Sequence, residues 1–103
     1  MKRIILTILM SVVLVIGVTA QKKYVKQAEG HITKNELKEA KTKLDMALQD
    51  EKSKVWGKTY FVYGTLAQTA GSSENEEFRK LFDNPFKLAY ENYQKAIELD
   101  DKN

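Results

Sequence analysis

The sequence predicts an all-α fold in which a helix pair occurs twice, and two observations support this prediction. Apolar residues in the last nineteen positions recur at spacings of three and four, so they fall on one side of a helix that begins at Pro85. A matching stripe occurs 49 residues earlier. The matched positions are Leu37, Ala40, Leu44, Ala47 and Leu48 in the first stripe and Phe86, Ala89, Tyr93, Ala96 and Ile97 in the second. Repetition of a helical unit indicates a solenoid, whereas a four-helix bundle, the alternative, does not require a constant offset.

The first twenty residues are predicted to be a secretory signal peptide. Lys2 and Arg3 form a positive start, which an uncharged apolar run follows. Small residues end this run, and cleavage is expected between Ala20 and Gln21. The alternative is an uncleaved membrane anchor, which so short a run disfavours because a spanning helix needs about 20 apolar residues. Export to the periplasm or cell envelope, or secretion, is therefore expected.

Charge and composition exclude several classes of partner. The full chain carries 17 basic and 14 acidic residues, a net charge of +3, and two of the basic residues lie in the segment 1–20. The expected mature chain, residues 21–103, therefore has a net charge of +1, which gives no electrostatic reason to expect nucleic acid as a partner. A membrane is expected as a partner only if the apolar segment is retained as an anchor. Because cysteine is absent, disulfide bonds and a lipid on an N-terminal cysteine are excluded.

The first helix pair is expected to consist of helices at about residues 21–32 and 36–51, joined by a short turn. A connection of this length makes the two helices antiparallel neighbours. Thr33 and Glu36 have the spacing of a capping box, in which both side chains bind backbone N–H groups at the start of the second helix. Asn35 is a second candidate cap.

The second pair is expected to consist of a helix at about residues 54–70, capped by Ser53, and the helix that begins at Pro85. Gly64 lies within the first of these helices, where glycine is unfavourable, so another helix is expected to cross closely there. Alanine at this position is expected to be much milder than leucine. Gly71 is expected to end the helix.

These features resemble the tetratricopeptide repeat, a family whose unit is a pair of antiparallel helices. The resemblance rests on a small residue midway along the first helix of a pair, with aromatic residues around it, and on two alanines seven residues apart on the second. One unit spans about residues 21–54 and another about residues 57–103. The matching residues are Tyr24, Ala28, Ala40, Leu44 and Ala47 in the first unit and Tyr60, Tyr63, Gly64, Ala67, Ala89, Tyr93 and Ala96 in the second. The resemblance implies a short solenoid of two stacked helix pairs, either complete or part of a longer array.

An insertion at about residues 71–83 interrupts the second unit. Phe78, Leu81 and Phe82 predict that it contains a short helical turn that folds back on the helices. Long connections of this kind are often functional, so the insertion is expected to be the part most specific to this protein.

The resemblance implies binding of a protein or peptide in a concave groove, lined by the first helices of successive units. The residues it places there are Lys22, Val25, Glu29, Ile32, Lys58, Phe61, Thr65 and Gln68. Lysine, amide and apolar side chains together suit an extended peptide better than a nucleotide or a metal ion. The alternative function is a structural or adaptor component of a cell-envelope assembly, which acts by stacking through its end faces.

The sequence predicts no catalytic, cofactor or metal site. His31 is the only histidine and cysteine is absent, which removes the usual nucleophile and zinc arrangements. The resemblance places His31 at an aromatic position between paired helices. An acidic cluster of Glu74, Glu76 and Glu77 lacks the alternating oxygen ligands and central glycine of a calcium loop, so a solvated loop is expected. A protein without enzymatic activity is therefore expected.

Aromatic residues occur in two further patterns, one on the helix predicted at residues 54–70 and its start and one on the last helix. Trp56, Tyr60 and Tyr63 share one side of a predicted helix, where a ligand box and an ordinary packed core are the alternatives, and the core is favoured. The last helix carries large apolar residues that no later segment of this sequence covers: Phe86, Tyr90, Tyr93 and Ile97. Such an uncovered end predicts further repeats, self-association or a partner that covers it.

Overall fold

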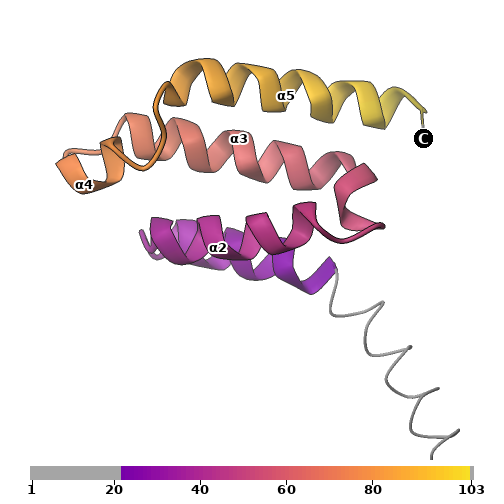
Figure 1. Ribbon diagram of the computed structural model, residues 1–103, viewed down its shortest axis with the longest axis horizontal. Coiled ribbons are helices and arrows are strands. Elements are labelled where there is room, and N and C mark those ends of the chain that lie inside the picture. The colour runs from indigo at the N-terminus through magenta and orange to yellow at the C-terminus, as the bar shows by residue number, and fades with distance from the viewer. Residues whose placement is uncertain (1–21, 103) are drawn as a thin grey trace, which may run out of the picture.

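The computed structural model describes residues 22–102, and all of the regular secondary structure in this range is helical. The elements are a first helix at residues 22–33, α2 at Leu37–Leu48, a 3-10 turn η1 at Ser53–Val55, α3 at Gly57–Gly71, α4 at Glu76–Arg79 and α5 at Pro85–Lys102 (Figure 1). The all-α prediction is confirmed. The predicted signal peptide lies outside the described residues.

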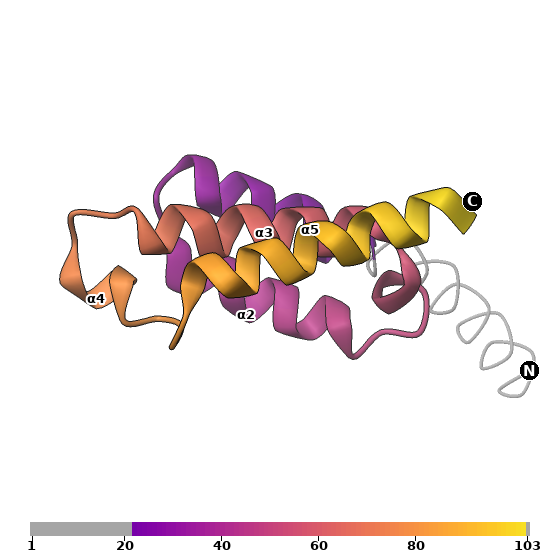
Figure 2. The same cartoon turned by 90° about the horizontal axis from the view of Figure 1, so that it is seen from above.

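The long helices lie in layers. In Figure 1, α5 runs along α3, and α3 lies over the first helix and α2. Figure 2 shows, from above, the first helix and α2 on either side of the line that α3 and α5 follow. The hydrophobic core lies between the first helix, α2 and α3. Its buried members are Val25, Ala28, Leu37, Ala40, Leu44, Ala47, Val62, Tyr63, Leu66 and Ala70. Burial of each large apolar side chain in such a core stabilises the fold by about 1.5–3 kcal/mol.

A tight turn at Asn35 reverses the chain between the first helix and α2. Asn35 has a φ of 62°, in the left-handed region that asparagine tolerates better than most residues. The N–H of Asn35 donates to the carbonyl of Ile32 at 3.0 Å, and that of Glu36 donates to the carbonyl of His31 at 2.7 Å. This pair of bonds is a Schellman motif, which satisfies the last carbonyl groups of the first helix.

The predicted capping box at this turn is wrong. The Thr33 hydroxyl donates back to the carbonyl of Glu29 at 3.0 Å, because Thr33 is still part of the first helix. The Glu36 carboxylate lies 3.0 Å from His31 Nδ1, and no side chain caps the start of α2. Asn35 acts through its backbone conformation and not as a side-chain cap.

The end of α2 also differs from the prediction. The helix expected at 36–51 ends at Leu48. The Asp50 carboxylate then accepts the backbone N–H groups of Lys52 at 3.2 Å and of Ser53 at 2.8 Å. Aspartate competes with helical hydrogen bonding in this way, so the chain turns here instead of continuing as a helix.

The start of α3 is later than predicted. Ser53 does not cap the helix expected at 54–70; it is fully buried in η1, and its carbonyl accepts the Thr59 hydroxyl at 2.7 Å. Trp56 is extended, with φ −94° and ψ 121°, and α3 begins after it at Gly57. Trp56 is therefore outside the helix to which its spacing assigns it.

A row of glycines on α3 faces α5, and its three members are Gly57, Gly64 and Gly71. A Cβ atom at Gly64 would lie 2.8 Å from two ring carbons of Tyr93 and 3.2 Å from the carbonyl oxygen of Ala89. Carbon atoms in ordinary contact are about 3.5–4.0 Å apart. The predicted close crossing of another helix at Gly64 is confirmed.

The other two glycines extend this close contact along the whole helix. A Cβ at Gly57 would lie 3.0 Å from the carbonyl oxygen of Ala96, and one at Gly71 would lie 2.9 Å from Pro85. The contacts run backward along α5 as they run forward along α3, so the two helices are antiparallel. Gly71 ends α3 as predicted, but no glycine in residues 22–102 has a positive φ, so the requirement at Gly71 is space for Pro85.

The connection between α3 and α5 packs against the core through α4 and the residues after it. Asn75 caps α4 by accepting the N–H of Glu77 at 2.9 Å. The predicted apolar residues of this segment, Phe78, Leu81 and Phe82, are partly buried against the core. The ring of Phe82 lies 5.8 Å from that of Tyr63. The prediction that this insertion folds back on the helices is confirmed.

Candidate functional site

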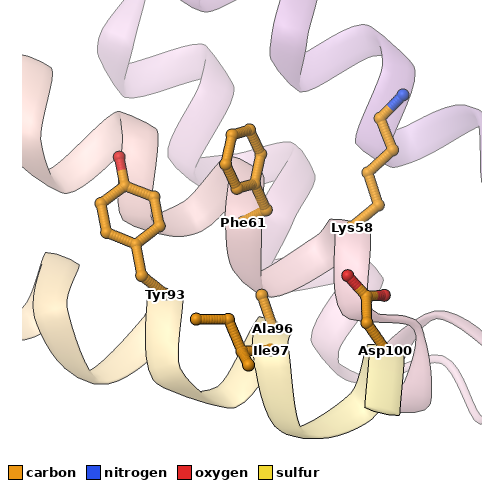
Figure 3. A pocket seen from close by; sticks show the side chains of 6 residues that line it. All are labelled: Lys58, Phe61, Tyr93, Ala96, Ile97 and Asp100. Carbon is orange, nitrogen blue, oxygen red and sulfur yellow. The ribbon is translucent and has the colours of Figure 1, made fainter. Parts of the chain in front are cut away.

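An apolar groove lies between α3 and α5. It has a volume of about 660 Å³ and is lined by Lys58, Phe61, Tyr93, Ala96, Ile97 and Asp100. Figure 3 shows Lys58 and Phe61 projecting from α3 and the other four from α5. Phe61 is 56% exposed and Ile97 61% exposed, so more than half of each residue is open to solvent. The groove is therefore an apolar surface with one cationic and one anionic side chain at the same end.

A smaller hollow lies beside it, between the first helix and α3. Its volume is about 150 Å³, and it is lined by Glu29, Ile32, Thr33, Phe61, Val62 and Thr65. Phe61 borders both hollows, so one surface continues from the first helix across α3 to α5. We call the residues that line the two hollows the Phe61 surface.

Five of the eight residues expected in a groove belong to the Phe61 surface: Glu29, Ile32, Lys58, Phe61 and Thr65. Gln68 lies at its margin, where its Oε1 accepts the Tyr93 hydroxyl at 2.8 Å. Lys22 lines neither hollow; its Nζ lies 5.4 Å from the centre of the Trp56 ring, which the Lys58 ammonium also approaches.

Val25 was expected in the groove, and the structure contradicts this. Its side chain is fully buried in the core, because the first helix turns this position toward α2 and α3. No ligand at the surface can reach it.

Polar groups of the Phe61 surface already have partners. Lys58 Nζ lies 3.2 Å from Glu29 Oε1, an exposed ion pair of the kind that contributes about 0–1 kcal/mol. The Tyr93 hydroxyl donates to Gln68, and the rings of Tyr93 and Phe61 are 5.6 Å apart. A ligand can displace the ion pair at little cost, whereas Tyr93 is held in place from two sides.

Four of the six residues that line the larger groove come from α5, and none of these four was among the groove residues expected from the sequence. Tyr93, Ala96, Ile97 and Asp100 line it together with α3. The signal that could have found them is the row of glycines on α3, since residues without side chains allow α5 to approach until its edge becomes a wall of the groove.

Three aromatic residues that the sequence spacing places on one side of a helix lie in different environments in the structure: Trp56, Tyr60 and Tyr63. Tyr63 is buried and donates to Asp45 at 3.1 Å; burial, and then the nearby Asp45 charge, raise the pKa of Tyr63. Tyr60 donates to the carbonyl of Lys54. Trp56 packs partly against the core, with the Lys58 ammonium 6.0 Å from its ring. They do not line one ligand box.

Groups that could support other chemistry are few in the described chain. His31 is partly exposed at the turn between the first helix and α2, where its Nδ1 lies 3.0 Å from Glu36 Oε1. Among residues 22–102, no cluster of three histidine, cysteine, aspartate or glutamate side chains is arranged to hold a metal ion. The same range contains no helix with the length and apolar character needed to cross a membrane.

Comparisons of the chain with protein-family models, with curated proteins and with solved structures find no match. The surface geometry therefore carries the argument about function.

Proposed function

We propose that this chain is an exported helical-repeat module, without catalytic activity, that binds an extended segment of another protein at the Phe61 surface. Two antiparallel helix pairs, the resemblance to the tetratricopeptide repeat and the signal-like pattern of residues 1–20 support the proposal. In tetratricopeptide repeats the ligand-binding face is formed by the leading helix of each pair. The corresponding helices here, the helix at residues 22–33 and α3, both contribute to the Phe61 surface.

The observation that carries the proposal is the apolar groove between α3 and α5. A groove of about 660 Å³ is large enough for a few side chains of a peptide. Phe61 and Ile97 offer apolar contact, while Lys58 and Asp100 at one end can each bind a charged or polar group of the ligand. An extended peptide with an apolar anchor and a polar neighbour fits this pattern.

The test selects peptides from a random display library on the purified protein and measures their binding to variants. Replacing Phe61 with alanine removes the residue that borders both hollows, so the selected peptides are expected to bind at least about 30-fold more weakly. Binding is measured by fluorescence anisotropy with labelled peptides.

The matched control is Val55→Ala. Val55 is 55% exposed, close to the exposure of Phe61, but it lies in η1 and lines neither hollow. Its replacement is expected to leave peptide affinity unchanged. Peptides that bind wild type and Phe61→Ala equally well would rule out the Phe61 surface as the binding site.

A second function, a structural part of a cell-envelope assembly that acts by stacking, is favoured by one observation. Phe86, Tyr90 and Ile97 are exposed on α5, the outermost helix of the layers. Capture of a ligand requires the Phe61 surface, to which Ile97 belongs, whereas stacking requires Phe86 and Tyr90, which line neither hollow.

A further inference from the structure

Two charged side chains lie at one end of the groove between α3 and α5, and only one of them has a partner in the described chain. Lys58 Nζ lies 3.2 Å from Glu29 Oε1 on the first helix and 6.0 Å from the centre of the Trp56 ring. In Figure 3 the Lys58 side chain extends away from Asp100. Among residues 22–100, whose side chains the structure describes, none forms an ion pair or hydrogen bond with the Asp100 carboxylate. The unpaired charge at this end of the groove is therefore negative.

The Asp100 carboxylate lies against the beginning of α3. A Cβ atom at Gly57 would lie 2.5 Å from Asp100 Oδ1 and 3.2 Å from its Cγ, so the missing side chain of Gly57 leaves the room that the carboxylate occupies. No side chain hydrogen-bonds to cap this helix, and the unpaired N–H groups at a helix start favour a nearby negative charge. Asp100 is nevertheless exposed, so a ligand in the groove can reach the carboxylate that α3 positions.

The apolar part of the groove begins about one helical turn before Asp100. Ala96 is only 4% exposed and forms the floor there, while Phe61 and Ile97 stand beside it with more than half of each residue exposed. Ala96 and Asp100 are four residues apart on α5, which is about 6 Å along the helix axis. In an extended peptide, side chains two residues apart point to the same side and are about 7 Å apart. One extended segment can therefore place an apolar side chain over Ala96 and a second side chain at Asp100.

We propose that the peptide bound at the Phe61 surface carries an apolar residue and, two positions from it, a lysine or arginine that pairs with Asp100. This inference rests on the proposed function and adds the chemical class of the ligand. A basic residue gives Asp100 an ion-pair partner. An acidic residue would have to displace Glu29 from Lys58 and would add a second negative charge near Asp100.

The lysines near the groove do not oppose this arrangement, because they lie toward the first helix. Lys22 belongs to that helix, and its Nζ is 5.4 Å from the centre of the Trp56 ring. Lys58 is directed to the same side by its ion pair with Glu29. A cationic group of the ligand would lie on the α5 side, where Asp100 is the only charged residue that lines the groove.

The experiment selects peptides from a random display library on the protein purified from cells that express the full chain. The selected sequences are expected to contain lysine or arginine two positions from an apolar residue more often than the library does. Replacing that basic residue with glutamine is expected to weaken binding about tenfold, and Asp100→Asn is expected to do the same to the unchanged peptide. The two changes together are expected to weaken binding no further than either alone, because both remove one ion pair. Fluorescence anisotropy measures the affinities.

The matched control is Glu98→Gln, which removes one negative charge from the same helix. Glu98 is exposed and lines neither hollow, so its replacement is expected to leave peptide affinity unchanged. This control separates a contact with Asp100 from an effect of net charge. The glutamine change in the peptide cannot alter the fold of the protein, so it tests the pairing even if Asp100→Asn changes stability.

Two results would overturn this inference and leave the peptide groove in place. In the first, peptides that lose affinity for Phe61→Ala carry no basic residue at the expected position or bind Asp100→Asn as tightly as wild type. In the second, the selected peptides carry an acidic residue there and are weakened by Lys58→Met but not by Asp100→Asn. Peptides that bind Phe61→Ala and wild type equally well would instead reject the proposed function, and this inference with it.

Discussion

Gly64 provides the sharpest test of the packing between α3 and α5. A Cβ atom at this position would lie 2.8 Å from Cδ1 and Cε1 of Tyr93, so the ring must move by about 1 Å to reach ordinary contact. The ring is not free to do so, because its hydroxyl is bonded to Gln68 at 2.8 Å and Phe61 packs beside it. The carbonyl of Ala89, at 3.2 Å, blocks relief by movement of the backbone.

We therefore expect Gly64→Ala to destabilise the fold by about 1 kcal/mol. Overpacking costs about 1–3 kcal/mol, and the better helix propensity of alanine offsets about 1 kcal/mol of it. The sequence predicts only that alanine is much milder than leucine, and the contact with Tyr93 adds that alanine also has a cost. Gly64→Leu is expected to cost about 3 kcal/mol or to prevent folding.

Thermal unfolding followed by circular dichroism measures these changes, with about 4–8 °C expected per kcal/mol for a domain of this size. Gly30→Ala is the control, because a Cβ there meets nothing within 4 Å, and it is expected to raise the melting temperature. In a Tyr93→Ala background the cost of Gly64→Ala is expected to disappear. If Gly64→Ala stabilises as much as Gly30→Ala, α5 does not contact α3 at this point and the packing argument is wrong.

Three further predictions concern other parts of the chain. Because the folded-state pKa of Tyr63 is raised above its ordinary value of 10.0, stability is expected to be retained below about pH 10 and to fall as pH rises beyond it. Urea unfolding at several pH values is expected to show a smaller alkaline loss for Tyr63→Phe than for wild type; equal losses would contradict the role of this group. Phe82→Ala is expected to lower the free energy of unfolding by about 2–4 kcal/mol, because the ring packs on Tyr63 and the core. If urea unfolding shows little change in this free energy, the packing of the insertion does not contribute to stability. Intact-mass analysis of the cell-expressed protein is expected to show a chain that begins at Gln21, and a mass that includes residues 1–20 would support a retained anchor.

The positions and faces of the helices could be predicted from the sequence because they depend on local spacing. Residues three and four apart share a helix face wherever the helix packs, so the stripe of Leu37, Ala40 and Leu44 identified a buried face without knowledge of its partner. Pro85 marked the start of α5 for an equally local reason, its fixed φ and missing N–H. Gly64 could be interpreted because glycine within a helix requires a contact to explain it.

The helix ends were harder to predict, because several side chains compete for the same backbone groups. Thr33 and Glu36 have the spacing of a capping box, yet the left-handed conformation of Asn35 leaves Thr33 within the first helix. Ser53 is a good cap by type, but the bonds of Asp50 hold it in a buried turn. Sequence spacing indicates which side-chain hydrogen bonds are possible, but the free energy of the whole turn determines which of them form.

The candidate site depended most on tertiary structure. Sequence spacing placed Val25 and Phe61 at equivalent positions of two helices, but one is fully buried and the other is 56% exposed. The difference arises because burial depends on the neighbours that surround a helix and not on the period within it. In the same way, Tyr93 and Ile97 became a wall of the groove only because α3 has glycines where α5 crosses it. The sequence by itself determined which residues are helical and which faces are apolar, and the packing distances between helices decided which of those faces remain open to a ligand.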